Sequence, residues 1–367
     1  MPLQKKAKPD FVLLIVTFLL LIVGMVMVYS SSAIWAQYKF DDSFYFLKRQ
    51  LLFAFFGVVF MIVLMNIPYQ FWKTKAKFLL FLCFFLLVIV LIPGVGLVRG
   101  GARSWLGIGA FSIQPSEFMK LSMIVFLARY LSIHQQTLVS FKKGLLPPLF
   151  IVLLAFSMIM LQPDLGTGAV MVITCMVMLY SAGAKVSHFI GLISIGILGL
   201  IGLILSAPYR MKRITSFLDP WEDPLGSGFQ IIQSLYAIGP GGLLGLGLGQ
   251  SRQKFHYLPE PQTDFIFAII AEEMGFIGGG FVLLLFVLMF IRGVRIAILS
   301  NDSFGTFLAI GIVSMLAIQV VINIGVVIGL FPVTGITLPL LSYGGSSLTL
   351  MLGAIGILLN ISQTIKI

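Results

Sequence analysis

The sequence predicts an all-α polytopic membrane protein with about ten transmembrane helices and one large extracytoplasmic loop between helices 7 and 8. Hydrophobic residues make up 59% of the 367 residues and charged residues only 10%. The mean hydropathy of +1.07 lies far above the range of soluble domains. Apolar residues gather in runs of about 20, the length that spans a bilayer as a helix. The longest stretch between such runs, about 207–264, is rich in Gly and Pro.

Each predicted helix is an apolar run that can satisfy its own backbone hydrogen bonds inside lipid. The runs lie at 11–30, 50–66, 77–95, 116–133, 145–162, 167–183, 187–206, 265–291, 303–329 and 344–362. The first run follows Lys5, Lys6 and Lys8 and is longer than the apolar part of a cleaved signal peptide. We therefore expect it to be an uncleaved first helix.

The basic residues orient these helices. The short segments KTKAK and FKKG fall on the same side as the N-terminus, and short cytoplasmic loops carry an excess of Lys and Arg. We therefore expect one membrane domain over 1–367, with both termini in the cytoplasm and the loop at about 207–264 outside. The net charge of +11 is interpreted as contact with anionic membrane lipids and not with nucleic acid.

The outer loop contains two notable stretches. SGFQIIQSLYAIGP predicts a short amphipathic helix at the membrane interface. GPGGLLGLGLG resembles a nucleotide-binding glycine motif, but no strand precedes it and no P-loop lysine follows it. It is either a flexible turn or a place where the backbone approaches a ligand or lipid closely.

Acidic residues in or beside the membrane are costly and are therefore candidates for function. Glu117 lies three residues before Lys120, so the two can pair, either to fix helix packing or to contact substrate. Glu272 and Glu273 cannot both share a helix face with Asp264, so at least one of them is structural. The candidate acids are Glu117, Asp164, Asp264, Glu272 and Glu273.

Two aspartates occupy outer turns. Asp164, in LQPDLGTG, either caps the following helix or supplies a second carboxylate to an outward cavity. Asp264, in LPEPQTDF, could also be a helix cap. However, basic residues of the same loop surround it in sequence, which favours a ligand that carries phosphate. The loop residues considered for substrate binding are Arg210, Arg213, Arg252 and Lys254.

The last predicted helix begins with small residues. In LPLLSYGGSSLTLM, Ser346 and Ser347 follow two glycines. Small residues here permit close helix contact or leave room for a lipid-linked substrate. Both serines are therefore candidate substrate-binding residues.

Six blocks in order resemble the SEDS family of bacteria, named for shape, elongation, division and sporulation. They are GARSW, QPSEFMKL, LQPDLGTG, PWEDPLGSGFQIIQS, LPEPQTDFIFAIIAEE and PVTGITLPLLSYGGSS. The likeness covers essentially the whole chain and is strongest to the FtsW and SpoVE branch of spore-forming Gram-positive bacteria. An ordered set of this kind is much more specific than any single block.

The resemblance implies a peptidoglycan glycosyltransferase of the plasma membrane that polymerises lipid II on the outer face and releases undecaprenyl pyrophosphate. It also implies a class B penicillin-binding protein as partner, with divisome or spore-cortex proteins. Asp264 matches the acidic residue that the family needs for polymerisation, and Glu117 with Lys120 matches a family pair within the membrane. Arg103 of GARSW joins the candidates for substrate binding.

The implied chemistry agrees with the residues. An α-linked donor and a β-linked product require inversion, so a carboxylate such as Asp264 can accept the proton of the attacking hydroxyl. The leaving pyrophosphate needs loop cations or a divalent ion, Mg or Mn, for which Asp264 is a possible ligand. No cofactor is built into the chain. The alternatives are a lipid II flippase, which would line both leaflets with polar groups, and a scaffolding division protein.

Overall fold

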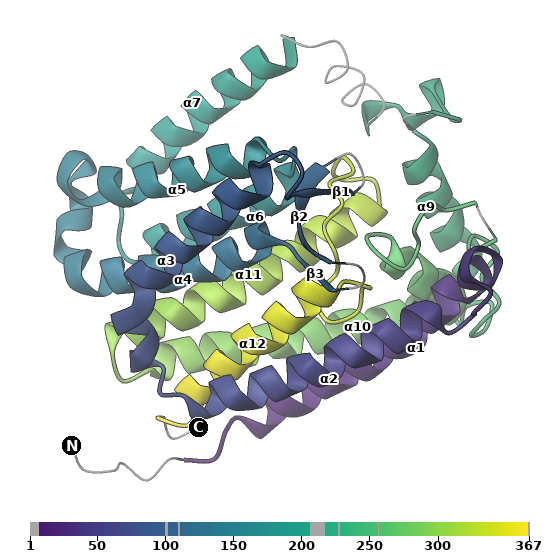
Figure 1. Cartoon of the computed structure of the whole chain (residues 1–367), viewed down its shortest axis with the longest axis horizontal. Coiled ribbons are helices and arrows are strands. Elements are labelled where there is room, and N and C mark those ends of the chain that lie inside the picture. The colour runs from purple at the N-terminus through teal and green to yellow at the C-terminus, as the bar shows by residue number, and fades with distance from the viewer. Residues whose placement is uncertain are drawn as a thin grey trace.

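The computed structural model describes residues 7–99, 102–108, 111–205, 217–226, 228–255 and 257–365. Its long helices run roughly side by side, and both ends of the chain lie at one end of the bundle (Figure 1). The long helices are α1 (Phe11–Phe40), α2 (Tyr45–Asn66), α3 (Gln70–Leu91), α4 (Pro115–His134), α5 (Leu146–Met160), α6 (Leu165–Ser181), α7 (Val186–Leu205), α10 (Ile266–Leu299), α11 (Ser303–Val327) and α12 (Gly345–Ser362).

Each of the ten predicted spans falls on one of these helices. Among the described residues, seven helices are long and apolar enough to cross a membrane. The protein is therefore a multi-pass membrane protein, as predicted. α6 is shorter, with 17 residues, and α4 carries a buried ion pair within its apolar length.

Two helices extend several residues past their predicted ends. α1 ends at Phe40 instead of 30, and α10 ends at Leu299 instead of 291. The 30 residues of α1 rise about 45 Å at about 1.5 Å per residue, whereas the hydrocarbon core is about 30 Å thick. α1 is therefore longer than the hydrocarbon core is thick.

The fold is all-α as predicted, with one small antiparallel sheet added to the helices. Its strands β1 (Leu97–Arg99), β2 (Ala102–Ile108) and β3 (Phe111–Ile113) lie in the order β1-β2-β3. The strands occupy the connection between α3 and α4, and two of them have only three residues. The Ser346 hydroxyl of α12 donates to the Ser112 carbonyl at 3.0 Å, which docks the sheet on the start of the last helix.

The outer loop contains the helix α9 (Phe229–Gly241), which confirms the predicted short helix. α9 packs against α10 and α11, and Ser234 donates to the Val327 carbonyl at 2.7 Å. Two one-turn segments, η1 (Gln135–Val139) and η2 (Phe141–Leu145), join α4 to α5, and η3 (Pro220–Glu222) precedes α9.

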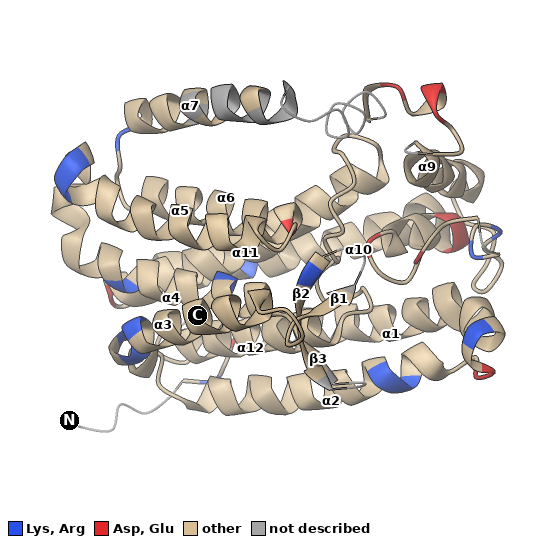
Figure 2. Cartoon of the chain, turned by 45° about the horizontal axis from the view of Figure 1, so that its top comes forward, with Lys and Arg blue, Asp and Glu red and all other residues tan. Residues whose placement is uncertain are grey.

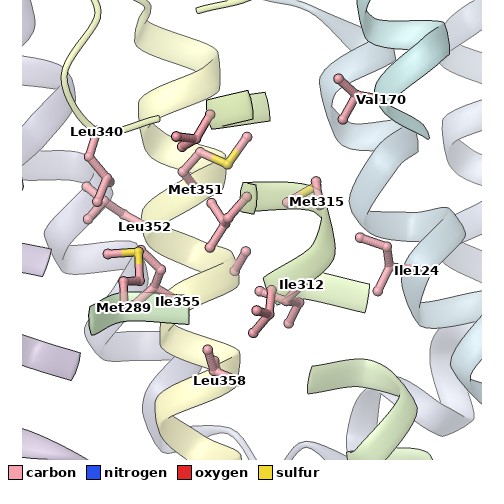
Figure 3. Packing of buried hydrophobic residues seen from close by; sticks show 14 of the residues in the cluster. Ile124, Val170, Met289, Ile312, Met315, Leu340, Met351, Leu352, Ile355 and Leu358 are labelled. Atoms are coloured by element: carbon pink, nitrogen blue, oxygen red, sulfur yellow. The ribbon is translucent and has the colours of Figure 1, made fainter. Parts of the chain in front are cut away.

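The core lies around α12, in which 83% of the residues are buried. Its Met351, Leu352, Ile355 and Leu358 point toward neighbouring helices (Figure 3). α12 also packs closely on α2, because a Cβ atom at Gly356 would lie 2.4 Å from the Met61 carbonyl oxygen. The small-residue contact proposed for the start of this helix is made at Gly345, where a Cβ would lie 2.6 Å from the Phe53 ring of α2.

The end of the bundle that holds the termini is fastened by polar contacts. The Arg292 guanidinium lies 2.6 Å from the buried Asp10 carboxylate. The Asp10 N–H donates to the Ser362 hydroxyl at 2.9 Å. α1, α10 and α12 are therefore tied together there. Lys and Arg residues lie at this end of the bundle and also at the opposite end (Figure 2).

Candidate functional site

Asp264 lies two residues before α10 on the loop that leads into it. The residue at the N-cap is Phe265, and no side chain caps this helix, so the interpretation of Asp264 as an N-cap is wrong. The Thr263 hydroxyl donates to the Asp264 carboxylate at 2.9 Å. A carboxylate that does not serve the helix backbone is available for another task.

Burial raises the pKa of the Asp264 carboxyl to about 6. The hydrogen bond from Thr263 opposes this rise, and the nearby negative charge of Glu260 adds a little to it. A base with a pKa near neutrality combines a large ionised fraction with useful basicity. This environment suits a general base.

The main chain around Asp264 is held from two sides. The Asn323 amide on α11 donates at 2.7 Å to the Asp264 carbonyl and also at 2.7 Å to the Ile336 carbonyl. The Tyr343 N–H donates to the Gln262 carbonyl at 2.8 Å. The segment 331–344 therefore fixes the position of Asp264. Sequence reasoning missed Asn323, although a polar amide inside an apolar helix is a signal of function or packing.

Glu272 and Glu273 both anchor the outer loop to α10. Glu272 accepts hydrogen bonds from the Ser251 hydroxyl and, at 2.8 Å, from the Arg252 N–H. Glu273 accepts from the Ser30 hydroxyl of α1 at 2.6 and 2.8 Å. The sequence predicts that at least one of them is structural, and the structure gives this role to both.

Main-chain hydrogen bonds join the glycine-rich stretch to α10. The N–H groups of Leu246 and Gly247 donate to the carbonyls of Glu272 and Glu273 at 2.9 and 3.0 Å. α10 is kinked at Gly275, whose φ is +65°, and a Cβ at Gly245 would lie 2.2 Å from the Glu273 carbonyl. The close approach of the backbone is thus made to α10 at Gly241 and Gly245, whereas a Cβ at Gly242 or Gly249 would meet no atom within 4 Å.

The candidate cations of the outer loop have different surroundings. Lys254 is buried, and its ammonium lies 3.2 Å from Glu273, which gives it a structural contact. Its role in substrate binding stays a prediction. Arg252 is exposed and is anchored through its N–H. Arg210 and Arg213 lie outside the described residues.

Asp164 caps α6 and also bridges to α4. Its carboxylate accepts from the Thr167 N–H at 3.1 Å, which is the predicted cap. Its second oxygen accepts from the Gln114 amide at 2.9 Å and from the Ser116 hydroxyl at 3.0 Å. The structure therefore uses Asp164 to join the first turns of α4 and α6.

Glu117 and Lys120 form the predicted pair on α4. Their charged atoms are 2.6 Å apart, and both side chains are buried. The second carboxylate oxygen of Glu117 has no hydrogen-bond partner within the described part of the chain. The pair is thus both a packing contact and a source of one further acceptor.

The remaining candidates lie near the start of α12. Ser346 is buried and donates to the sheet, whereas Ser347 is half-buried, with its hydroxyl 3.2 Å from that of Thr337. Arg103 lies on β2 opposite Val98 and is half-buried.

One segment connects most of these groups. Within 331–344, the Ile336 carbonyl accepts from the same Asn323 amide that donates to the Asp264 carbonyl. The Tyr343 N–H donates to the Gln262 carbonyl, and Thr337 contacts Ser347. The same segment reaches the Asp164 turn, since a Cβ at Gly166 would lie 2.7 Å from the Thr334 carbonyl. The segment 331–344 therefore contacts both the Asp264 loop and the Asp164 turn. The Glu117–Lys120 pair follows the Asp164 contacts on α4.

Comparisons with known proteins show the family to which the chain belongs. Residues 11–367 match the family FTSW_RODA_SPOVE, described as "Cell cycle protein". The chain is 67% identical over 359 residues to "Stage V sporulation protein E" of Bacillus subtilis (strain 168), covering 98% of each chain. It is 44% identical over 357 residues to "Probable peptidoglycan glycosyltransferase FtsW" of Geobacter sp. (strain M18), covering 97% of each.

Solved structures show the same fold. A chain from "Structural coordination of polymerization and crosslinking by a peptidoglycan synthase complex" is 31% identical, with a TM-score of 0.83, and the match covers 97% of this chain and 98% of that one. The Rod shape determining protein RodA of Thermus thermophilus is 27% identical, with a TM-score of 0.73 over 98% of each chain. The chain belongs to the FtsW, RodA and SpoVE family, as the ordered blocks predicted.

Proposed function

We propose that this protein is a peptidoglycan glycosyltransferase that polymerises lipid II into glycan strands on the outer face of the plasma membrane, in cell division or sporulation. The observation that carries the proposal is the carboxylate of Asp264, which is held before α10 with a pKa of about 6. The relatives named as glycosyltransferases support the same activity. Undecaprenyl pyrophosphate is the second product.

The reaction is a single inverting displacement. The 4-hydroxyl of one sugar attacks the anomeric carbon of the donor from the face opposite the pyrophosphate, and Asp264 accepts the hydroxyl proton. A positioned base of this kind contributes about 10² to 10⁴ in rate. Asn323 and Thr263 keep the carboxylate segment in place during the step.

The leaving pyrophosphate requires positive charge. Arg103 and the exposed Arg252 are the candidates that the structure describes. Among the described residues, no three His, Cys, Asp or Glu side chains form a metal cluster. If a divalent ion, Mg or Mn, takes part, the Asp264 carboxylate would help to hold it, and the ion would supply Lewis-acid stabilisation of the leaving pyrophosphate.

The partner that we propose is a class B penicillin-binding protein that cross-links the new strands, together with divisome or spore-cortex proteins. The related chain from a peptidoglycan synthase complex supports a partner in peptidoglycan synthesis. Lipid II and membrane lipids are the other ligands.

The decisive experiment uses the purified protein with its partner and labelled lipid II in vesicles, followed by gel separation of glycan strands. Strands are expected with the intact protein. Labelled lipid II that crosses the bilayer without forming strands would instead identify a flippase.

The rate of strand synthesis is expected to depend on pH through Asp264. Because the general base acts when ionised, activity falls as pH decreases through about 6, the pKa of this carboxyl. We expect a plateau above this pH and a decline of about tenfold for each unit well below it. The initial rate between pH 5 and 8 measures the effect. A rate that stays constant across pH 6 would contradict the assignment of the base.

Cysteine labelling tests the orientation. The native Cys83 and Cys175 are buried, so a cysteine introduced at Lys142 or Gly226 gives a specific signal. With a cytoplasmic N-terminus, an impermeant thiol reagent applied outside intact cells labels the Gly226 position and leaves the Lys142 position unmodified. The reverse pattern would invert the topology and place Asp264 inside.

A further inference from the structure

Aromatic rings stack at the outer ends of α1 and α2, which lie side by side at the end of the bundle opposite the termini (Figure 1). Phe40 stacks on Tyr45 with ring centroids 3.8 Å apart, and Trp35 contacts Phe40 at 6.0 Å. Phe46 packs on Trp35 at 5.5 Å. We call these four rings, Trp35, Phe40, Tyr45 and Phe46, the aromatic ladder.

The aromatic ladder holds two cations. The Lys39 ammonium lies 4.5 Å from the Trp35 ring centroid, and the Arg49 guanidinium lies 4.3 Å from that of Tyr45. A cation over a ring face is attracted by the quadrupole of the ring but keeps its full charge. The rings therefore position both groups without neutralising them.

Neighbouring residues show that ion pairing is possible here and is not used by these two cations. Lys48 lies 2.8 Å from Asp42, and Asp41 accepts a hydrogen bond from Gln37 at 2.8 Å. Within the described ranges, Lys39 and Arg49 form no ion pair. Two positive charges are thus left available for an anion.

The ladder is continuous with the candidate site. Phe46 contacts the Tyr343 ring edge-on at 5.0 Å, and the Tyr343 N–H binds the Gln262 carbonyl, two residues before Asp264. Gln50, which follows Arg49, donates to the Ser342 carbonyl at 3.0 Å. The helix that carries Arg49 is therefore bonded to the same 331–344 segment that fixes Asp264.

We propose that Lys39 and Arg49 form a phosphate-binding site for the pyrophosphate of the lipid-linked substrate. This site rests on the proposed function and extends it, because it names the groups that hold the phosphates of the substrate at the outer leaflet. Arg binds phosphate oxygens in a bidentate manner, and Lys acts as a point charge. The headgroups of anionic lipids carry the same phosphate chemistry, so the experiment must separate the two sources.

The test measures the binding of farnesyl pyrophosphate to the purified protein in nanodiscs of phosphatidylcholine by calorimetry. We expect Lys39→Gln and Arg49→Gln each to weaken binding by about tenfold, since a hydrogen bond to a charged group contributes enough for that factor. Lys48→Gln is the matched control, because that lysine is already paired. It should bind within about twofold of the wild type.

Two further arms complete the design. Nanodiscs that contain phosphatidylglycerol show whether the headgroup competes, and inorganic pyrophosphate shows whether the lipid tail is needed. Arg49→Lys keeps the charge and should retain most of the binding even if Arg49→Gln folds poorly. Unchanged affinity of the Lys39→Gln/Arg49→Gln double variant would overturn the proposal, as would a loss seen only for phosphatidylglycerol. Binding does not require strand synthesis, so a protein that binds pyrophosphate but makes no strands would contradict the proposed function alone.

Discussion

Asp264→Asn is expected to lower the rate of strand synthesis by at least about 10²-fold. The amide keeps the shape of the carboxylate and can still accept the hydrogen bond from Thr263, but it cannot accept the proton of the attacking hydroxyl. The main-chain bond from Asn323 to the Asp264 carbonyl does not involve the side chain, so the loop should stay in place. The labelled lipid II assay measures the loss.

The control for this variant is stability. Thermal unfolding in detergent and binding of the partner should remain close to wild type, because Asp264 does not cap α10. Removing a charge that burial disfavours costs the fold little. A folded Asp264→Asn protein with a nearly normal rate would end the catalytic assignment. In that case Asp164 becomes the next candidate, since Glu272 is engaged by Ser251 and Arg252.

Glu117→Ala is expected to destabilise the fold by about 3 to 5 kcal/mol, because it leaves the Lys120 ammonium buried without a partner. The two charged atoms are 2.6 Å apart in α4, and the Lys120 side chain is 1% exposed. The double variant Glu117→Ala/Lys120→Ala should recover part of this stability. The thermal midpoint in detergent, measured for the single and double variants, gives the comparison.

The exposed pair Lys48–Asp42 supplies a matched reference. Lys48 is 67% exposed, so Lys48→Ala should leave the thermal midpoint unchanged, as expected for a solvent-screened pair. A double Glu117/Lys120 variant no more stable than either single variant would show that the two residues do not act as a pair.

The membrane spans could be predicted from the sequence because a helix in lipid needs an uninterrupted apolar run, and such runs are visible without tertiary information. The small sheet could not be predicted in this way. β1 and β3 have three residues each, and strands of this length are stabilised by docking, here through the bond from Ser346 to Ser112.

The candidate site was predictable in part. Asp264 is conspicuous as an acid at the mouth of a helix, and the spacing of Glu117 and Lys120 specifies their contact. The partners of Lys254 and of the glycine-rich stretch depend on how the outer loop folds back on α10, which local sequence does not encode. Lys39 and Arg49 were missed because the first predicted span ends at 30, so their helical positions were treated as a connection.

The hydrogen bonds between the outer loop and α10 beside the kink at Gly275 tolerate substitutions in the loop better than insertions. Main-chain atoms form the bonds from Leu246 and Gly247 to α10, so these bonds persist when most loop side chains change. They do not persist when residues are inserted, because one extra residue moves each donor away from its carbonyl. The number of residues between these two hydrogen bonds and Asp264 is therefore constrained more strongly than their identity. A one-residue insertion there should be more harmful than several substitutions.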